Sequence, residues 1–450
     1  MLVQPMDVPL NNFPVFGISS DHGFLPADDP LRELPGQFTA WEEVADALPK
    51  LIIAGRLRRA IEGLPILSAG AIDDPRSTRR AMMLLSYLGH GYVWGEPQAA
   101  SVIPKNIAVP WFHVATQLGR PPVLSYASYA LDNWGRIDSK QPVAIDNVQI
   151  LQNFLAGADE DWFILIHVDI EIKAAGAIRA IPTAVQADDD EDPVSLTGAL
   201  EDIGASIAQM MVTLRRMPEF CDPYIYYHRV RPYIHGWKNN PAVPDGVIYD
   251  GVEFYHGKPM QFRGKTGAQS GIIPALDAVL GVAQERDELR TYLMEMRDYM
   301  PSGHRAFVEA VERQSAIRDF VSGASADHKP LVEAYNGCLE GVEAFSSIHM
   351  EFAASYIFKQ AQSTCSNPNS VGTGGTPFMP YLKKHRDETA ASQIGGWKSQ
   401  THKVPLVRPR LRPVRRRCLR RSTPRLSLKS HPYVRPITVS APHRTASRTA

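Results

Sequence analysis

The sequence has few cysteines and no long apolar run. Its four cysteines, Cys221, Cys338, Cys365 and Cys418, lie far apart and form no C-x-x-C pair. This spacing argues against a disulfide framework and against a structural zinc site. No apolar run reaches the roughly 18 residues of a membrane-spanning helix, and the N-terminus lacks the basic start and apolar core of a secretory signal. Together these absences predict a soluble protein of the reducing cytosol.

Acidic residues are missing from the C-terminal end. Residues 397–450 contain 15 Lys and Arg and no Asp or Glu, while the rest of the chain holds 33 basic and 48 acidic residues. This proline-rich stretch has no helical period and cannot bury a core, so we expect a disordered tail over 396–450. A basic tail can attract nucleic acid or an anionic membrane. Because this tail lacks interleaved aromatic residues and any known module, we favour a divergent or wrongly predicted terminus. We expect neither partner.

Apolar residues recur at helical spacing over most of the remaining chain, which predicts a mainly α fold. The predicted helices are 41–61, 77–88, 124–133, 146–156, 160–180, 194–216, 272–298, 302–321 and 328–361. Strand patterns are short, at 143–150 and 247–254, and the acidic run 188–192 is predicted to be a solvated loop. The proline-rich stretch 104–122 is predicted to be a connector. It separates a small N-terminal domain (1–120) from a large helical domain (121–395).

His349 lies in an apolar stripe of the helix predicted at 328–361. Steps of three or four residues place one set on the same face: Val342, Phe345, His349, Phe352 and Tyr356. A single histidine in such a stripe is more often a hydrogen-bonded core residue. The alternative is an axial ligand, because haem iron takes a neutral imidazole nitrogen from a rigid element. Spacing alone leaves both interpretations open.

A second histidine, His167, lies in the segment 161–182. As a helix, this segment places Phe163 and His167 on one face, and its small residues at 174–177 permit close approach of a neighbouring helix or a flat ligand. As a strand, His167 and Asp169 would form an H-x-D pair that, with a distant histidine, could hold non-haem iron. Strand patterns are scarce in this chain, so we favour the helix.

Two further segments carry candidate binding residues. Tyr226, Tyr227 and Arg231 lie close together, and a buried arginine beside aromatic rings can grip a carboxylate with two parallel hydrogen bonds. Such an arginine is more often a surface cation resting on a ring. The sequence GTGGT at 372–376 is not followed by Gly-Lys-Ser/Thr, so it is no P-loop. It predicts only a loop able to close over a site.

Several longer blocks, in order along the chain, resemble the indoleamine 2,3-dioxygenase family. They are LGRPPVLSYASYALDNW (118–134), EIKAAGAIRAIP (171–182), IHGWKNNPAVPDGVIYDGV (234–252), MPSGHRAFVEAVE (300–312) and GTGGTPFM (372–379). The resemblance implies an α-helical fold with a small and a large domain and haem b between them. It implies insertion of both atoms of O₂ across the indole C2–C3 bond of L-tryptophan, giving N-formylkynurenine, the first step of the kynurenine pathway. The implied partners are tryptophan, O₂ and a reductant for ferric haem, and we expect a cytoplasmic monomer.

The resemblance also implies roles for single residues. His349 is similar to the proximal haem ligand of the family. Tyr126 and Phe163 match positions that line the distal pocket over the haem. Arg231 matches the residue that binds the substrate carboxylate, and Tyr226 stands where the family commonly has Phe.

The Gly-rich loop has an implied role as well. Thr376 corresponds to the loop threonine that closes on the substrate ammonium and a haem propionate, with Gly374 and Gly375 beside the cofactor.

Two positions depart from the mammalian pattern. His167 stands where mammalian members have Ser, so we assign it to accept the indole N–H hydrogen bond as an orienting group. Ser346, one turn before His349, stands where they have Arg. The salt bridge of that Arg is therefore absent, and we expect Asp277 to need another partner, with altered haem affinity or redox potential.

Two other functions stay open at this point. Tyr226 and Ser346 make a haem-binding sensor or carrier with little turnover conceivable. A non-haem iron dioxygenase would use His167 and Asp169 instead.

Overall fold

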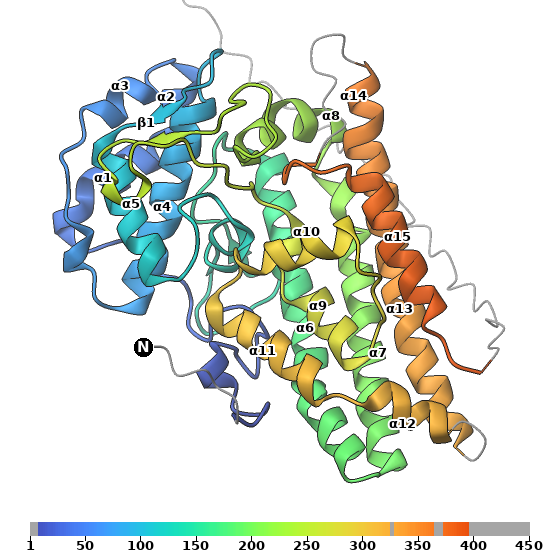
Figure 1. The fold of residues 1–450 in the computed structure, drawn as a ribbon. Helices are drawn as coiled ribbons and strands as arrows, with labels where there is room; N and C mark the ends of the chain where they lie inside the picture. The colour runs from blue at the N-terminus through green and yellow to red at the C-terminus, as the bar shows by residue number, and fades with distance from the viewer. Residues whose placement is uncertain (1–7, 325–327, 364–371, 396–450) are drawn as a thin grey trace, which may run out of the picture. The chain divides into compact units, whose positions relative to one another are not determined.

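Long helices dominate the protein, and the prediction of a mainly α fold is confirmed (Figure 1). The computed structural model describes residues 8–324, 328–363 and 372–395. The predicted basic tail therefore lies outside the described residues. Within them, no helix is both long and apolar enough to cross a lipid bilayer.

The helices and turns follow one another along the chain. The N-terminal α-helices are α1 (Thr39–Asp46), α2 (Leu48–Ile53), α3 (Leu57–Glu62), α4 (Pro75–Trp94) and α5 (Lys105–Gln117). The later ones are α6 (Ala158–Asp189), α7 (Pro193–Leu214), α8 (Pro223–Ile225), α9 (Ile272–Val279), α10 (Glu288–Arg297), α11 (Ser302–Gln314), α12 (Ile317–Ala324), α13 (Lys329–Ala353), α14 (Lys359–Ser363) and α15 (Phe378–Ala391). Short 3-10 turns are η1 (Phe13–Phe16), η2 (Gly36–Phe38), η3 (Ala69–Ala71), η5 (Met217–Glu219), η7 (Arg231–Ile234), η8 (Glu253–Tyr255) and η9 (Gly267–Gln269). Short π turns are η4 (Ala127–Leu131), η6 (Tyr226–Val230) and η10 (Ala354–Phe358).

Strands are few and short, as predicted. β1 (Val102–Ile103) pairs in parallel with β4 (Ile248–Tyr249), with Val102 opposite Ile248. β2 (Gly135–Arg136) pairs antiparallel with β3 (Val148–Gln149), with Gly135 opposite Gln149. These two-residue ladders join loop segments to each other and contribute few side chains to the hydrophobic core.

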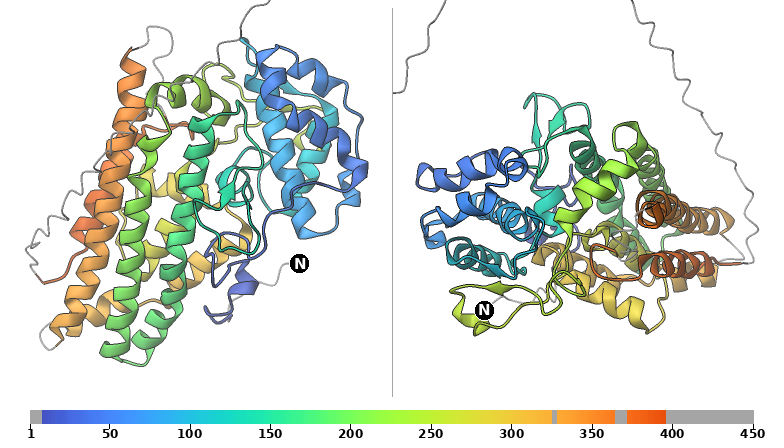
Figure 2. Two further views of the ribbon diagram at one scale, coloured as in Figure 1. Left: turned by 180° about the vertical axis from the view of Figure 1, so that it is seen from behind. Right: turned by 90° about the horizontal axis from the view of Figure 1, so that it is seen from above.

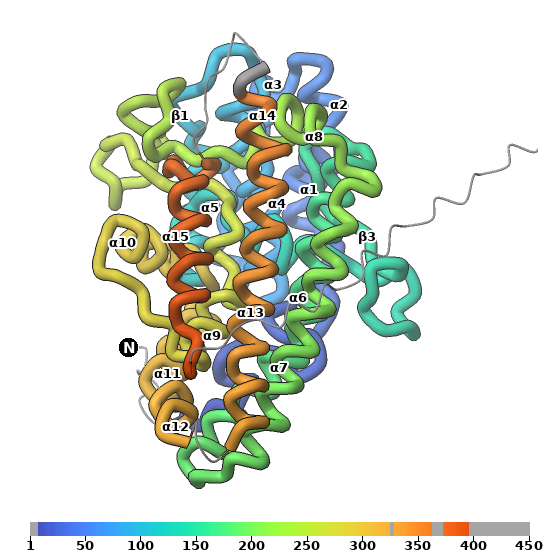
Figure 3. The backbone as a smooth tube through the Cα atoms, turned by 90° about the vertical axis from the view of Figure 1, so that its right-hand side faces the viewer, coloured from blue at the N-terminus to red at the C-terminus, as the bar shows by residue number. Residues whose placement is uncertain are grey.

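Two hydrophobic cores hold the helices together. The first surrounds α4 and α5 and buries large side chains such as Trp111, and the second lies among α6, α7, α9, α11 and α13. α6 belongs to both, because Ile164 and Val168 lie in the first core and Ile166 and Ile170 lie in the second. Seen from above in Figure 2, the N-terminal helices form one group, and the later helices, which include α6, α7 and α13, form another. α13 lies beside α7 and α15 (Figure 3).

The small residues of α6 allow close helix packing, as the sequence predicts. A Cβ on Gly176 would lie 2.4 Å from Oγ of Ser206 in α7, so the two helices pack closely at this glycine and a larger residue would require Ser206 to shift. Asp192 caps the start of α7, since its carboxylate accepts the backbone N–H groups of Val194 and Ser195. Asp188 is buried in the last turn of α6. Asp190 and Glu191 form an exposed turn before α7, so the prediction of a solvated loop is confirmed there and is wrong for Asp188.

The predicted connector at 104–122 was also wrong, because α5 occupies most of it. Pro104 lies at the N-cap of α5, where a missing N–H costs nothing. Pro110 lies six residues into the helix and removes one internal hydrogen bond there. Burial of the surrounding helix, including Ile107 and Trp111, outweighs this loss.

Other predicted helices are divided or absent. The stretch 272–298 forms α9 and α10 with a break after Gly281, whose φ is +60°. The stretch 302–321 likewise breaks into α11 and α12. The stretch 146–156 is not helical, because the side chain of Asn133 bonds both backbone groups of Gln152 and holds the segment open. The boundary predicted at residue 120 stays a prediction.

The packing between α4 and α5 gives a first testable prediction. A Cβ on Gly89 would lie 2.2 Å from Cζ3 of Trp111, whose ring is fully buried. We expect Gly89→Ala to lower the free energy of unfolding by about 1–3 kcal/mol, measured by urea denaturation. Gly337→Ala is the control, because its Cβ would meet nothing within 4 Å. It should be neutral or gain up to about 1 kcal/mol. Equal stabilities of the two variants would contradict the close packing of Gly89 against Trp111.

Candidate functional site

One stripe of α6 carries the first group of candidate residues. Phe163, His167 and Glu171 follow one another at intervals of four, so their side chains share a face of the helix. The His167 ring lies 4.6 Å from the Phe163 ring and 5.8 Å from the Tyr126 ring, between ring centroids. Tyr126 immediately precedes η4. The structure thus brings together Tyr126, Phe163 and His167, which the sequence places at one site.

The environment of His167 defines its chemistry. Nδ1 lies 2.7 Å from the backbone oxygen of Phe163, which can only accept, so Nδ1 carries the proton. Burial, and then the charge of Lys265, hold the pKa of His167 well below its ordinary value. The ring is therefore neutral near pH 7, and Nε2 presents a lone pair. Nζ of Lys265 lies 3.3 Å from that nitrogen.

Tyr226 lies in the turn η6, and Arg231 begins the next turn, η7. Asp222 starts this region by capping α8 through the backbone N–H groups of Tyr224 and Ile225. The Tyr226 ring lies 4.5 Å from the Phe163 ring, so the two candidates are in contact. Arg231 is 3% exposed, and burial lowers its pKa. The interpretation of Arg231 as a surface cation was therefore wrong.

His349 lies in α13 and faces the same region. Its ring is accessible to solvent, yet surrounding protein lowers its pKa to about 4, mainly by burial and then through Lys265. His349 also lowers the pKa of His167, so the two imidazoles lie within electrostatic reach. Within the described part of the chain, the His349 ring makes no hydrogen bond.

His90 shows what a structural core histidine looks like in this fold. Its Nδ1 lies 2.8 Å from the backbone oxygen of Tyr233, and its Nε2 accepts the backbone N–H of Leu124 at 2.9 Å. Both ring nitrogens of His90 are thus used within the protein. The contrast with His349 favours the interpretation of His349 as a ligand.

The residues around His349 fit a haem. A neutral imidazole on a rigid helix is the donor that haem iron takes. The aromatic rings of Phe163 and Tyr226 offer an apolar wall, and the buried cations Arg231 and Lys265 suit carboxylate groups.

The alternative iron site built on His167 and Asp169 was wrong. Two residues apart on α6, they point in different directions. The carboxylate of Asp169 accepts the hydroxyl of Thr213 in α7 at 2.6 Å, away from the histidine. No group of three or more metal-binding side chains occurs among the described residues.

The Gly-rich loop packs on the segments that carry the site. A Cβ on Gly375 would lie 2.5 Å from the backbone oxygen of Lys238, and its φ is +76°, so glycine is required. Thr373 donates its hydroxyl to the backbone oxygen of Lys265 at 2.6 Å. Thr376 is buried, and its side chain bonds Tyr292. Thr373 therefore contacts the segment that carries Lys265, while the predicted roles of Thr376, Gly374 and Gly375 stay predictions.

Sequence reasoning missed Lys265 and Glu171. Lys265 lies in an irregular stretch where no periodicity marks a buried side chain. Glu171 is fully buried and accepts the hydroxyls of Tyr126 and Ser270, each at 2.8 Å. Burial raises the pKa of Glu171 to about 7. The available signal for Glu171 was its position four residues after His167, because Phe163, His167 and Glu171 share one face of α6.

Asp277 has the new partner that the sequence led us to expect. Nε2 of His385, in α15, lies 2.7 Å from Oδ2 of Asp277, in α9. The carboxylate raises the pKa of His385 above its ordinary value of 6.5, against the opposing effect of burial. A titratable histidine therefore pairs with this carboxylate and ties α15 to α9.

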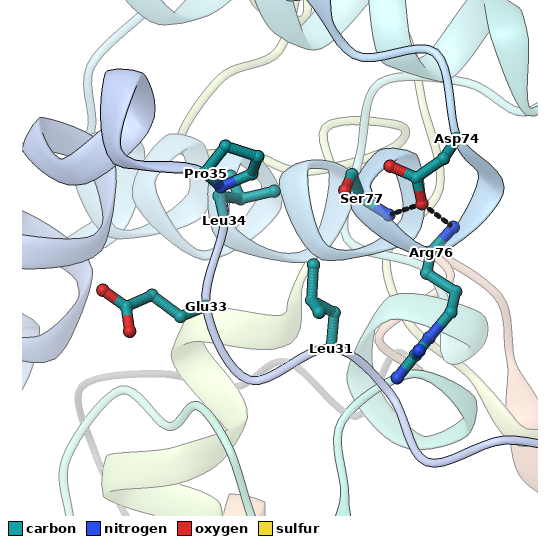
Figure 4. A pocket seen from close by; sticks show the side chains of 7 residues that line it. All are labelled: Leu31, Glu33, Leu34, Pro35, Asp74, Arg76 and Ser77. Atoms are coloured by element: carbon teal, nitrogen blue, oxygen red, sulfur yellow. Dashed lines mark hydrogen bonds between the residues drawn. The ribbon is translucent and has the colours of Figure 1, made fainter.

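A surface hollow elsewhere carries no such chemistry. It lies at the start of α4, lined by Leu31, Glu33, Leu34, Pro35, Asp74, Arg76 and Ser77 (Figure 4). The carboxylate of Asp74 accepts the backbone N–H groups of Arg76 and Ser77 and so caps α4. Its polar group is thus occupied by the helix end.

Known proteins resemble this chain over nearly all of the described residues. A family model for indoleamine 2,3-dioxygenase matches residues 12–392. Indoleamine 2,3-dioxygenase 1 of Rattus norvegicus is 37% identical over 388 residues, which cover 83% of this chain and 94% of the relative. Indoleamine 2,3-dioxygenase 2 of Homo sapiens is 35% identical over 390 residues, covering 84% and 94%. The indoleamine 2,3-dioxygenase of Saccharomyces cerevisiae is 32% identical over 432 residues, covering 85% and 94%.

The Asp277–His385 pair predicts a pH-dependent contribution to stability. Because the folded pKa of His385 is raised, the contribution is full below pH 6.5 and is lost as the pH rises through the folded pKa. We expect His385→Gln to cost about 1–2 kcal/mol of unfolding free energy near pH 6 and much less near pH 9. Urea denaturation at both pH values measures this. His328→Gln, at an exposed histidine, is the control. A cost that stays constant across the range would contradict the pairing.

Proposed function

Because the chain belongs to the indoleamine 2,3-dioxygenase family, we propose that it converts L-tryptophan and O₂ to N-formylkynurenine. This family consists of haem dioxygenases, so haem with its iron is the cofactor. The observation that carries the proposal is His349, whose imidazole is neutral, makes no hydrogen bond within the described chain, and lies within electrostatic reach of His167.

The proposal assigns His349 as the residue that would hold the haem iron. The lowered pKa of His349 leaves the imidazole unprotonated at neutral pH, which metal ligation requires. When bound, the haem supplies the iron centre that activates dioxygen. α13 is continuous from Lys329 to Ala353, so the ring has a rigid support.

Arg231 would bind and orient the substrate. Its guanidinium is buried, and a carboxylate held there by charge-assisted hydrogen bonds meets little competition from water. Phe163 and Tyr226 lie in contact and present aromatic surface on which an indole ring can pack. Most of the rate gain would then come from positioning in a water-poor site.

His167 would orient the indole nitrogen. Its Nδ1 proton is engaged with the backbone oxygen of Phe163, so Nε2 is the acceptor that an indole N–H needs. The low pKa of His167 keeps Nε2 unprotonated at neutral pH, and an indole N–H would there take the place of the Lys265 amine, whose Nζ lies 3.3 Å from Nε2. The role is one of orientation, and it requires no proton transfer.

The haem assignment and the product can be tested together. The purified protein with a reductant, O₂ and tryptophan should form N-formylkynurenine, detected by mass spectrometry. His349→Ala should lose the haem Soret band and all product, because the side chain that would hold the iron is gone. His113→Ala, at an exposed histidine of α5, should keep both. A Soret band in His349→Ala would refute the assignment of His349 as the residue that holds the haem iron. A wild-type band without product would instead support a haem sensor or carrier.

The carboxylate role of Arg231 predicts a selective loss of substrate binding. Arg231→Met should raise KM for tryptophan by about 10–100-fold, the range for a lost hydrogen bond to a charged group. The Soret band should persist, because Arg231 does not hold the iron. Steady-state kinetics together with absorption spectra measure both. A KM within twofold of the wild type would remove Arg231 from the substrate site.

A further inference from the structure

Lys265 is a buried cation at the centre of the candidate site. Its side chain is 3% exposed, and its Nζ lies over three aromatic rings. The distances to the ring centroids are 4.4 Å for Phe163, 5.1 Å for Tyr129 and 5.7 Å for Tyr126. These rings include both residues that the family resemblance assigns to the distal pocket. The amine therefore points into the place where ligands are expected.

No carboxylate of the described chain neutralises this amine. Glu171 accepts the hydroxyls of Tyr126 and Ser270 through one oxygen, and its charge has no effect on the pKa of Lys265. The one polar contact of Nζ is Nε2 of His167 at 3.3 Å, and this neutral ring offers no charge. Accordingly, burial alone lowers the pKa of Lys265 to about 7.

The neighbouring cations show that this arrangement is unusual within the protein. Arg263, two residues earlier, pairs with Glu295 at 2.8 Å, and Lys238 pairs with the same carboxylate at 2.7 Å. Burying an unpaired ammonium is costly, because the charge loses its hydration and gains no counter-charge. A buried lysine that faces a ligand site without a protein partner is matched by an anion that the ligand supplies.

The backbone of Lys265 fixes its place at the site. Its N–H donates to the backbone oxygen of Ile234 at 3.2 Å, in the same turn as Arg231. Its carbonyl oxygen accepts the hydroxyl of Thr373 from the Gly-rich loop. The residue is thus held between the turn that carries Arg231 and the loop, and its amine has a fixed origin.

We propose that Lys265 is a second carboxylate-binding residue of this site, which forms an ion pair with a carboxylate of a bound ligand. Two ligands of the proposed function carry such a group: haem, through its propionates, and the amino-acid substrate. The inference rests on the proposed function to that extent. It adds a cation that none of the roles inferred from the family resemblance includes.

The experiment compares ligands with and without their carboxylates. Apoprotein is titrated with haem and with haem dimethyl ester, and the Soret band gives each affinity. The haem-loaded protein is titrated with L-tryptophan and with tryptamine, which lacks the carboxylate, and the spectral change gives each affinity. We expect Lys265→Met to reduce the wild-type preference for the free carboxylate by about tenfold or more in one of the two pairs. The pair that changes identifies the source of the carboxylate.

Three further measurements keep the outcome decisive. Lys265→Arg should retain most of the preference, because it keeps the positive charge, and Lys258→Met, at an exposed lysine, should leave it unchanged. The urea midpoint of the apoprotein should stay equal or rise in Lys265→Met, because an unpaired buried charge is removed. Unchanged preferences in both pairs would overturn the inference while leaving the proposed function intact. A wild-type protein that binds neither haem nor tryptophan would refute the proposed function itself.

Discussion

Helix α6 packs against the N-terminal core through Ile164 and Val168 and against the helical core through Ile166 and Ile170. Because both sides are buried, the helix can neither rotate nor slide without opening one of the cores. Phe163 and His167 lie on this helix, so their positions are fixed by the packing of the whole protein. Burial on two sides also removes the amphipathic asymmetry that usually marks a surface helix.

The charges of the site follow from the same burial. The lowered pKa values of His167 and His349 leave both imidazoles neutral, so each can offer a lone pair at neutral pH. Cations behave differently according to their partners. Arg263 is compensated by Glu295, whereas Lys265 lies among aromatic rings with no carboxylate of the described chain paired to it. The site thus combines neutral acceptors with uncompensated positive charge, which is an arrangement suited to ligands that carry carboxylates.

Helical periodicity predicted α7 and α13 because each buries a long apolar face. It failed for α5, where Pro104 and Pro110 suggested a connector, since tertiary burial overrode a local breaker. His349 could be assigned from ordered blocks of resemblance, and spacing alone left it ambiguous. Lys265 and His385 could not be predicted, because each becomes important only when segments distant in sequence meet. Sequence patterns report local periodicity, and such long-range pairings leave no trace in it.

The double burial of α6 limits how this protein can diverge. Its exposed positions are few: Ala158, Arg179, Thr183, Gln186 and Asp189. Substitutions at the buried positions of the helix alter one of the two cores. Changes in ligand preference are then easier to acquire through the loops that surround α6, such as the one that carries Lys265. The scaffold is held constant, while its irregular segments are free to vary the chemistry it presents.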